Sequence, residues 1–92
     1  MTEKHQRLMQ LTNEAIEKAE EVYRADTKAF GGVNWADLSA HEVLRCEDQD
    51  GKISWRVLVE EAHCERLESF IFRYIDDRAP EEFPGLEVRT EW

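Results

Sequence analysis

The 92-residue sequence has few of the features that identify a functional class. It contains two cysteines, and no apolar run approaches the ~20 residues needed to cross a bilayer. Residues 1–10 are charged and lack the apolar core of a signal peptide. We therefore expect a single cytoplasmic domain over residues 1–92, without a disulfide framework.

Basic residues are also scarce, with 12 Lys and Arg against 21 Asp and Glu, for a net charge of −9. This balance disfavours general binding to a nucleic-acid backbone, because such affinity comes from Lys and Arg neutralising phosphates. It favours approach to a basic surface, such as the nucleic-acid-binding groove of another protein. The alternative is that the charge only keeps a small domain in solution.

Complete metal-binding motifs are missing. If Gly51 is placed at position 6 of a calcium loop, Cys46 falls at position 1 and Val57 at position 12, where oxygen ligands are required. Zinc sites use paired ligands two to four residues apart, whereas the only close pair here is the adjacent His63 and Cys64. The remaining zinc-type residues are His41 and Cys46. We expect no metal site and no cofactor.

Catalytic motifs are missing as well. Cys64 and His41 could form a nucleophile and a base, but no third residue is placed to orient them. Gly31 and Gly32 follow a predicted helix rather than a strand, so they do not form a phosphate-binding loop. We therefore expect that the protein is not an enzyme.

The spacing of apolar residues along the sequence predicts five secondary-structure elements. Apolar residues at three- and four-residue steps predict helices over 3–30 and 62–78, the first capped by Thr2. Alternation of apolar and polar residues predicts strands over 53–60 and 86–92, and a less regular strand around 42–47.

The stretch "DQDG" between the first two strands is typical of a hairpin turn, in which Gly51 takes a positive φ and the aspartates bond to their own backbone. The element order α-β-β-α-β predicts an α+β fold. We expect a three-stranded antiparallel sheet of strand order 2-1-3, with both helices on one face and the other face open.

Acidic and aromatic residues form the first candidate interaction surface. Asp, Glu and exposed aromatic side chains would meet Lys and Arg on a partner, with the aromatics as anchors. The aromatics Phe83 and Trp92 could also be exposed. The candidate partner-binding residues are Asp48, Asp50, Glu60, Glu61, Asp76, Asp77, Glu81, Glu82, Trp35 and Phe72.

Three arginines form the second candidate surface, because Arg45, Arg56 and Arg89 could lie together on the open sheet face. Guanidinium groups suit phosphates and carboxylates, so this face could contact nucleic acid in a larger complex. The more ordinary interpretation is a set of cross-strand ion pairs. A third possibility is a homo-oligomeric subunit that pairs through a strand edge or the first helix.

The layout as a whole resembles that of phage-encoded anti-CRISPR inhibitors. The resemblance covers the length, the acidity, the "CEDQDGKISW" hairpin and the "CERLESFIFRYIDD" helix, and it includes no diagnostic motif. It implies a stoichiometric inhibitor that binds a CRISPR effector complex and blocks target DNA, either by occupying a basic groove or by locking a conformation.

Overall fold

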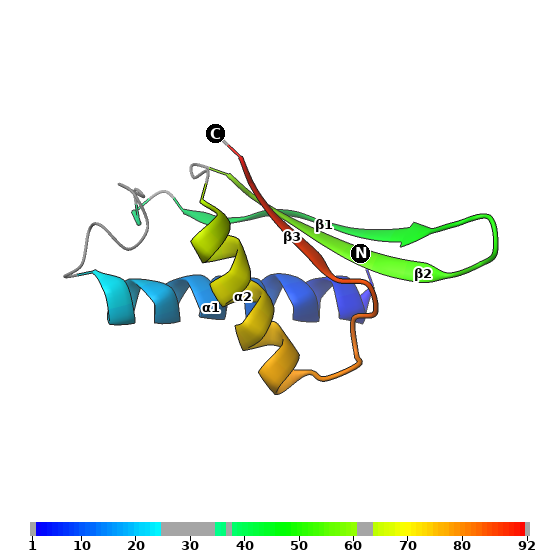
Figure 1. Cartoon of the computed structure of the whole chain (residues 1–92), viewed down its shortest axis with the longest axis horizontal. Coiled ribbons are helices and arrows are strands. Elements are labelled where there is room, and N and C mark those ends of the chain that lie inside the picture. The colour runs from blue at the N-terminus through cyan, green and yellow to red at the C-terminus, as the bar shows by residue number, and fades with distance from the viewer. Residues whose placement is uncertain (1, 25–34, 37, 61–63, 92) are drawn as a thin grey trace.

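The computed structural model describes residues 2–24, 35–36, 38–60 and 64–91 (Figure 1). The elements follow the predicted order α-β-β-α-β. They are α1 (Glu3–Tyr23), β1 (Ser39–Glu47), β2 (Ile53–Glu60), α2 (Glu65–Arg78) and β3 (Glu87–Glu91). The predicted ends of the two helices at 25–30 and 62–63 lie outside the described residues.

Helix α1 begins at the predicted cap, where the Thr2 hydroxyl accepts a hydrogen bond from the His5 backbone nitrogen at 3.3 Å. Its buried stripe includes one polar residue, Thr12. The Thr12 hydroxyl donates to the Leu8 carbonyl oxygen at 2.8 Å, so it is buried without an unmet hydrogen bond. The apolar members of the stripe are Leu8, Leu11, Ala15, Ile16 and Ala19.

The hairpin turn is confirmed. Gly51 has a φ of 78°, and its backbone nitrogen donates to the Asp48 carbonyl oxygen at 3.1 Å. The Asp48 carboxylate accepts from the backbone nitrogens of Asp50 at 2.9 Å and Lys52 at 2.8 Å. This turn projects past the start of α1 (Figure 1).

The predicted strand order was wrong. The sheet has the order β1-β2-β3 and is mixed, since β2 pairs antiparallel with β1 but parallel with β3. The most apolar strand, β2, occupies the centre, and the crossover through α2 places β3 directly beside it. Strand β1 carries charged residues and a bulge between Ala40 and Glu42, both of which are common on edge strands.

Both helices pack on the same face of the sheet, as predicted (Figure 1). Trp55, Val57 and Val59 of β2 form the centre of the core. Their neighbours in register, Val43 on β1 and Val88 on β3, extend the apolar layer to either side. From α2 the buried residues are Leu67, Ile71 and Ile75. No other described element packs on the opposite face, named here the open sheet face.

Candidate interaction surface

The open sheet face carries two of the three predicted arginines. Arg56 and Arg89 lie on it, on β2 and β3 respectively. Arg45 does not, because it pairs with Trp55, whose side chain points into the core. The prediction for Arg45 was wrong because a strand with weak alternation does not reveal which side chains face inward. Arg45 instead lies near Glu47, with 3.9 Å between Nη1 and Oε2.

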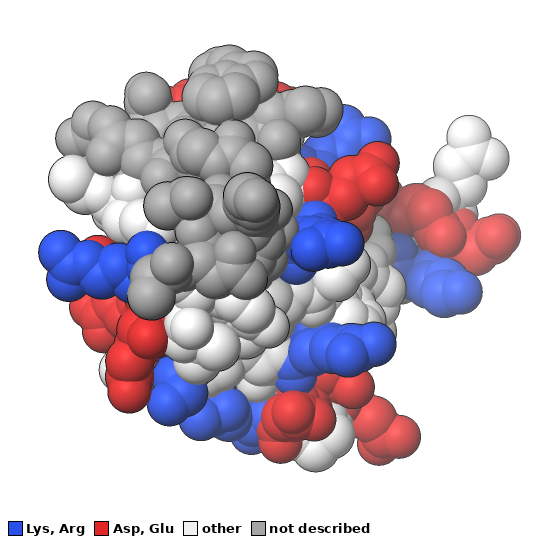
Figure 2. All heavy atoms as spheres, turned by 60° about the vertical axis from the view of Figure 1, so that its left-hand side comes forward, with Lys and Arg blue, Asp and Glu red and all other residues white. Residues whose placement is uncertain are grey.

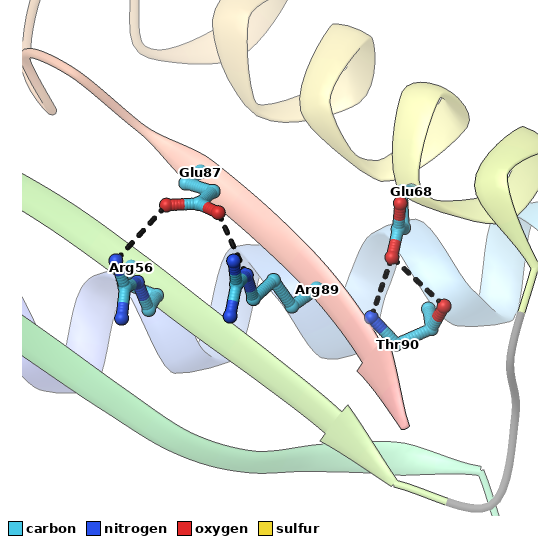
Figure 3. Close-up of polar contacts among 5 residues, drawn as sticks. All are labelled: Arg56, Glu68, Glu87, Arg89 and Thr90. Atoms are coloured by element: carbon cyan, nitrogen blue, oxygen red, sulfur yellow. Dashed lines mark hydrogen bonds and ion pairs between the residues drawn. The ribbon is translucent and has the colours of Figure 1, made fainter. Parts of the chain in front are cut away.

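Glu87 lies between the two outward arginines (Figure 3). Its Oε1 is 2.7 Å from Arg89 Nε, and its Oε2 is 3.2 Å from Arg56 Nη2. The hydrogen bond from Arg89, aided by the charge of Arg56, holds the pKa of Glu87 below its ordinary value of 4.5. Both guanidinium groups are therefore engaged with the same carboxylate.

Three of the predicted acidic contacts are engaged within the protein. The Asp48 carboxylate holds its own turn. Glu60 Oε1 lies 3.4 Å from His41 Nε2, and Glu82 Oε1 accepts from Arg7 Nε at 2.6 Å. Glu61 lies outside the described residues. These contacts reduce the set of carboxylates that are open to a partner.

The net negative charge does not form a continuous acidic patch on the face seen in Figure 2. Lys and Arg side chains lie beside Asp and Glu side chains over the described part of this face. Close ion pairs among the described residues are consistent with this mixing: Lys18 Nζ lies 3.7 Å from Glu21 Oε1, and Arg89 Nε lies 2.7 Å from Glu87 Oε1. The charge total alone therefore does not locate an interaction site.

An apolar hollow flanked by acids lies where α2 ends. Phe72 is 40% exposed and borders a hollow of about 280 Å³, named here the Phe72 hollow. The only charged side chains among the described residues that line it are Asp76 and Glu81. Its apolar and small lining residues are Phe72, Ile75, Ala79, Phe83, Pro84, Gly85 and Leu86.

The loop that closes the Phe72 hollow is held from several sides. Lys4 Nζ donates to the Glu82 carbonyl oxygen at 3.0 Å, and Arg7 binds the Glu82 carboxylate. The Phe83 ring packs edge-on against Trp55, with 5.5 Å between ring centroids. These contacts with α1 and β2 make the hollow a preformed feature of the fold.

Gly85 brings the same loop close to the sheet. Its φ is 65°, and a Cβ at this position would lie 2.9 Å from the Cβ of Ser54. Only glycine fits this combination of backbone conformation and close approach. The glycine therefore fixes the distance between the loop and β2.

The two acids that line the hollow, and Asp77 next to one of them in sequence, occupy backbone positions that disfavour them. Asp76 and Asp77 lie in the last turn of α2, where the helix dipole disfavours negative charge. Glu81 has a φ of 63°, a backbone conformation that residues other than glycine, asparagine and aspartate rarely adopt. Within the described part of the chain, none of the three carboxylates has a hydrogen-bond or ion-pair partner. Unfavourable charge placement and strained backbone of this kind are concentrated at functional sites in proteins.

A second hollow of about 280 Å³ lies on the other side of Phe72, bordered by Glu68, Arg73 and Val88. Its acid is already engaged, since the Glu68 carboxylate accepts two hydrogen bonds from Thr90 (Figure 3). A shallow groove of about 510 Å³ runs along α1 from Gln6 to Glu17, lined by Met9 and by the side chains of polar and acidic residues. Both hollows beside Phe72 lie near the lower limit of ligand-pocket volumes, about 300 Å³.

The other predicted aromatic anchors are less accessible than Phe72. Trp35 is partly buried and packs against the core, and Phe83 is buried. Trp92 lies outside the described residues. Of the three predicted aromatic anchors that the structure describes, Phe72 is therefore the most exposed.

Within the described residues, no group of three His, Cys, Asp or Glu side chains could hold a metal ion. His63 of the zinc-type residues lies outside them. In the same part of the chain, no helix has the length and apolar character required to span a bilayer.

The sequence pointed to Phe72, Asp76 and Glu81 as candidate contact residues, but it did not predict the hollow between the helix and the loop. Ile75, Ala79 and Leu86 meet only when the loop folds back, and the signal for that was the "APEEFPG" stretch with its prolines and glycine. The roles of Lys4 and Arg7 had no sequence signal, because they contact Glu82 from the other end of the chain.

Comparison with known proteins assigns the chain to no family. No family model matches the sequence, and no curated protein or solved structure is similar enough to indicate a relationship.

Proposed function

We propose that the protein is a non-enzymatic binding protein that docks its Phe72 hollow on a basic surface of a partner. The observation that carries this proposal is the combination of an exposed aromatic ring with two unpaired carboxylates around one preformed hollow. Aromatic side chains in such settings supply much of the binding energy at interfaces, and flanking charges speed the encounter and select the partner.

The consequence for the partner would be inhibition. A domain of 92 residues that covers a basic nucleic-acid-binding groove excludes the nucleic acid from it. A CRISPR effector complex is the first partner to test, given the resemblance in length, charge and layout to anti-CRISPR inhibitors.

The alternative, a nucleic-acid-contacting sheet face, is supported less well. Arg56 and Arg89 are paired with Glu87, and Arg45 belongs to the other face. Bringing phosphates to this face would require replacing the ion pairs with Glu87 while leaving its negative charge nearby.

Affinity capture with matched variants tests the proposal. The tagged protein is incubated with bacterial lysate, with and without nuclease and at low and high salt. The variants are Phe72→Ala and the pair Asp76→Asn with Glu81→Asn. The controls are Leu44→Ala, which removes a similarly exposed apolar side chain from the open sheet face, and the pair Glu17→Gln with Glu65→Gln, which removes two exposed acids elsewhere.

We expect a partner that survives nuclease, weakens with salt, and is lost with both hollow variants but not with the controls. Capture that depends on nucleic acid, and that is lost when Arg56 and Arg89 are replaced by Gln, would support the alternative. Capture that is unchanged by the hollow variants would contradict the proposal.

A further inference from the structure

We propose that the side chain received by the Phe72 hollow is an arginine of the partner. This inference rests on the proposed function and specifies its chemistry. The volume of the hollow, about 280 Å³, is at the lower limit for a ligand pocket and is enough for one side chain.

The charges around the hollow favour a cation. Asp76 and Glu81 come from different segments, one from the last turn of α2 and one from the loop beyond it. No Lys or Arg is among the described residues that line the hollow. Of the two bases on the second half of α2, Arg78 packs on Tyr74, with 3.6 Å from its guanidinium carbon to the ring centroid, and Arg73 lines the second hollow rather than this one. Both lining carboxylates are therefore without a cation among the described residues and can accept hydrogen bonds from one supplied by a partner.

The exposed ring of Phe72 favours arginine over lysine. A guanidinium is planar and weakly hydrated, so it stacks on an aromatic face while its several N–H groups donate to more than one carboxylate. A lysine ammonium is compact and strongly hydrated, and loses more hydration on entering an apolar hollow. The packing of Arg78 on Tyr74 is an example of the same stacking within α2.

The apolar lining accommodates the rest of the side chain. The three methylenes of arginine can lie along apolar surface while the charged group reaches the acids at the rim. Ile75, Pro84 and Leu86 provide that surface. Because the loop is held by Arg7 and Lys4 through Glu82, the hollow need not form on binding, which lowers the entropic cost.

A peptide titration tests this inference without knowledge of the natural partner. Three capped peptides of the same Gly and Ser background carry arginine, lysine or citrulline at the same positions. Citrulline keeps the shape of arginine without its charge. Binding is followed through the backbone amide NMR signals of the isotope-labelled protein, and Kd is obtained from signals of residues 72–86.

We expect the arginine peptide to bind about fivefold more tightly than the lysine peptide, and the citrulline peptide to show no saturable binding. Shifts should be confined to residues 72–86. The pair Asp76→Asn with Glu81→Asn should weaken arginine binding about tenfold or more, whereas the pair Glu17→Gln with Glu65→Gln should leave it unchanged. Asparagine is chosen at position 81 because it tolerates the positive φ.

The variant Phe72→Leu separates the aromatic contribution from simple apolar area. It should keep binding but reduce the preference for arginine over lysine towards unity. Equal binding of the lysine and arginine peptides to the parent, or no saturable arginine binding, would overturn the inference. The proposed function is tested separately by capture of the partner. It fails if capture is insensitive to the variants at Phe72, Asp76 and Glu81, whatever the peptides show.

Discussion

Glu68 on α2 accepts two hydrogen bonds from Thr90 on β3, one from the backbone nitrogen at 2.7 Å and one from the hydroxyl at 2.9 Å. The same hydroxyl accepts from the Cys64 backbone nitrogen at 2.9 Å, just before α2 begins. These contacts join the helix start to the edge strand. Thr90 is buried, so removing its hydroxyl leaves the Cys64 nitrogen without this acceptor.

Replacing Thr90 by Val should therefore lower the free energy of unfolding by about 1–3 kcal/mol. Glu68→Gln should also destabilise the protein, because it removes the charge from two hydrogen bonds. Urea unfolding measures both effects. The control is Glu65→Gln, which removes a carboxylate from the same helical turn and has no such contact with β3. An equal effect of the Glu65 and Glu68 variants would contradict this account.

Gly85→Ala should destabilise the protein more than Gly51→Ala. Both glycines have a positive φ, but a Cβ at Gly85 would lie 2.9 Å from the Ser54 Cβ, whereas at Gly51 the nearest contact is 3.8 Å away. We expect a loss of about 1 kcal/mol at Gly51 for the backbone conformation, and a further 1–3 kcal/mol at Gly85 for the steric clash. Thermal or urea unfolding of the two variants compares them directly, and equal losses would show that the close approach to β2 is absent.

Asp76→Asn should stabilise the protein while weakening its binding. A carboxylate in the last turn of α2 opposes the helix dipole, so its removal should raise the free energy of unfolding by about 0.3–1 kcal/mol. Glu65→Gln, in the first turn, should have the opposite sign. Unfolding and partner capture measured on the same samples test both effects. A destabilised Asp76→Asn variant would indicate that the carboxylate supports the fold rather than binding.

The pKa of the Glu87 carboxyl should depend more on Arg89 than on Arg56. Its pKa is lowered first by the hydrogen bond from Arg89 and then by the charge of Arg56. Because the folded pKa is below the unfolded one, the stabilisation is complete above the unfolded value and is lost as pH falls through the folded value. NMR titration of the side-chain carboxyl should show a higher pKa in Arg89→Gln, and a smaller rise in Arg56→Gln. A pKa that does not change in Arg89→Gln would contradict the arrangement in Figure 3.

The element pattern could be predicted because it depends on local periodicity and turn chemistry. Apolar spacing located both helices, and the alternation in β2 together with Gly51 located the hairpin. The strand order could not be predicted in the same way. Strand β3 had two edges available to it, and the choice of β2 depends on how α2 packs across the sheet rather than on any local signal in 87–91.

The candidate surface was predictable only in part. Phe72 falls off the apolar stripe of its helix, so its exposure could be predicted from the sequence. The orientation of Arg45 could not, because β1 alternates weakly, and the engagement of Glu82 by Arg7 depends on residues 75 positions apart. Long-range contacts of this kind decide which of the many acids are open to a partner.

The most direct test that the partner binds at the Phe72 hollow is hydroxyl-radical footprinting of the protein alone and in its captured complex. Phe72, Leu44 and Val22 are exposed by 40%, 38% and 52%, and they report on the hollow, the open sheet face and α1 respectively. We predict that oxidation of Phe72 falls in the complex while that of Leu44 and Val22 is unchanged. Protection of Leu44 with Phe72 still oxidised would place the partner on the sheet face and contradict the account.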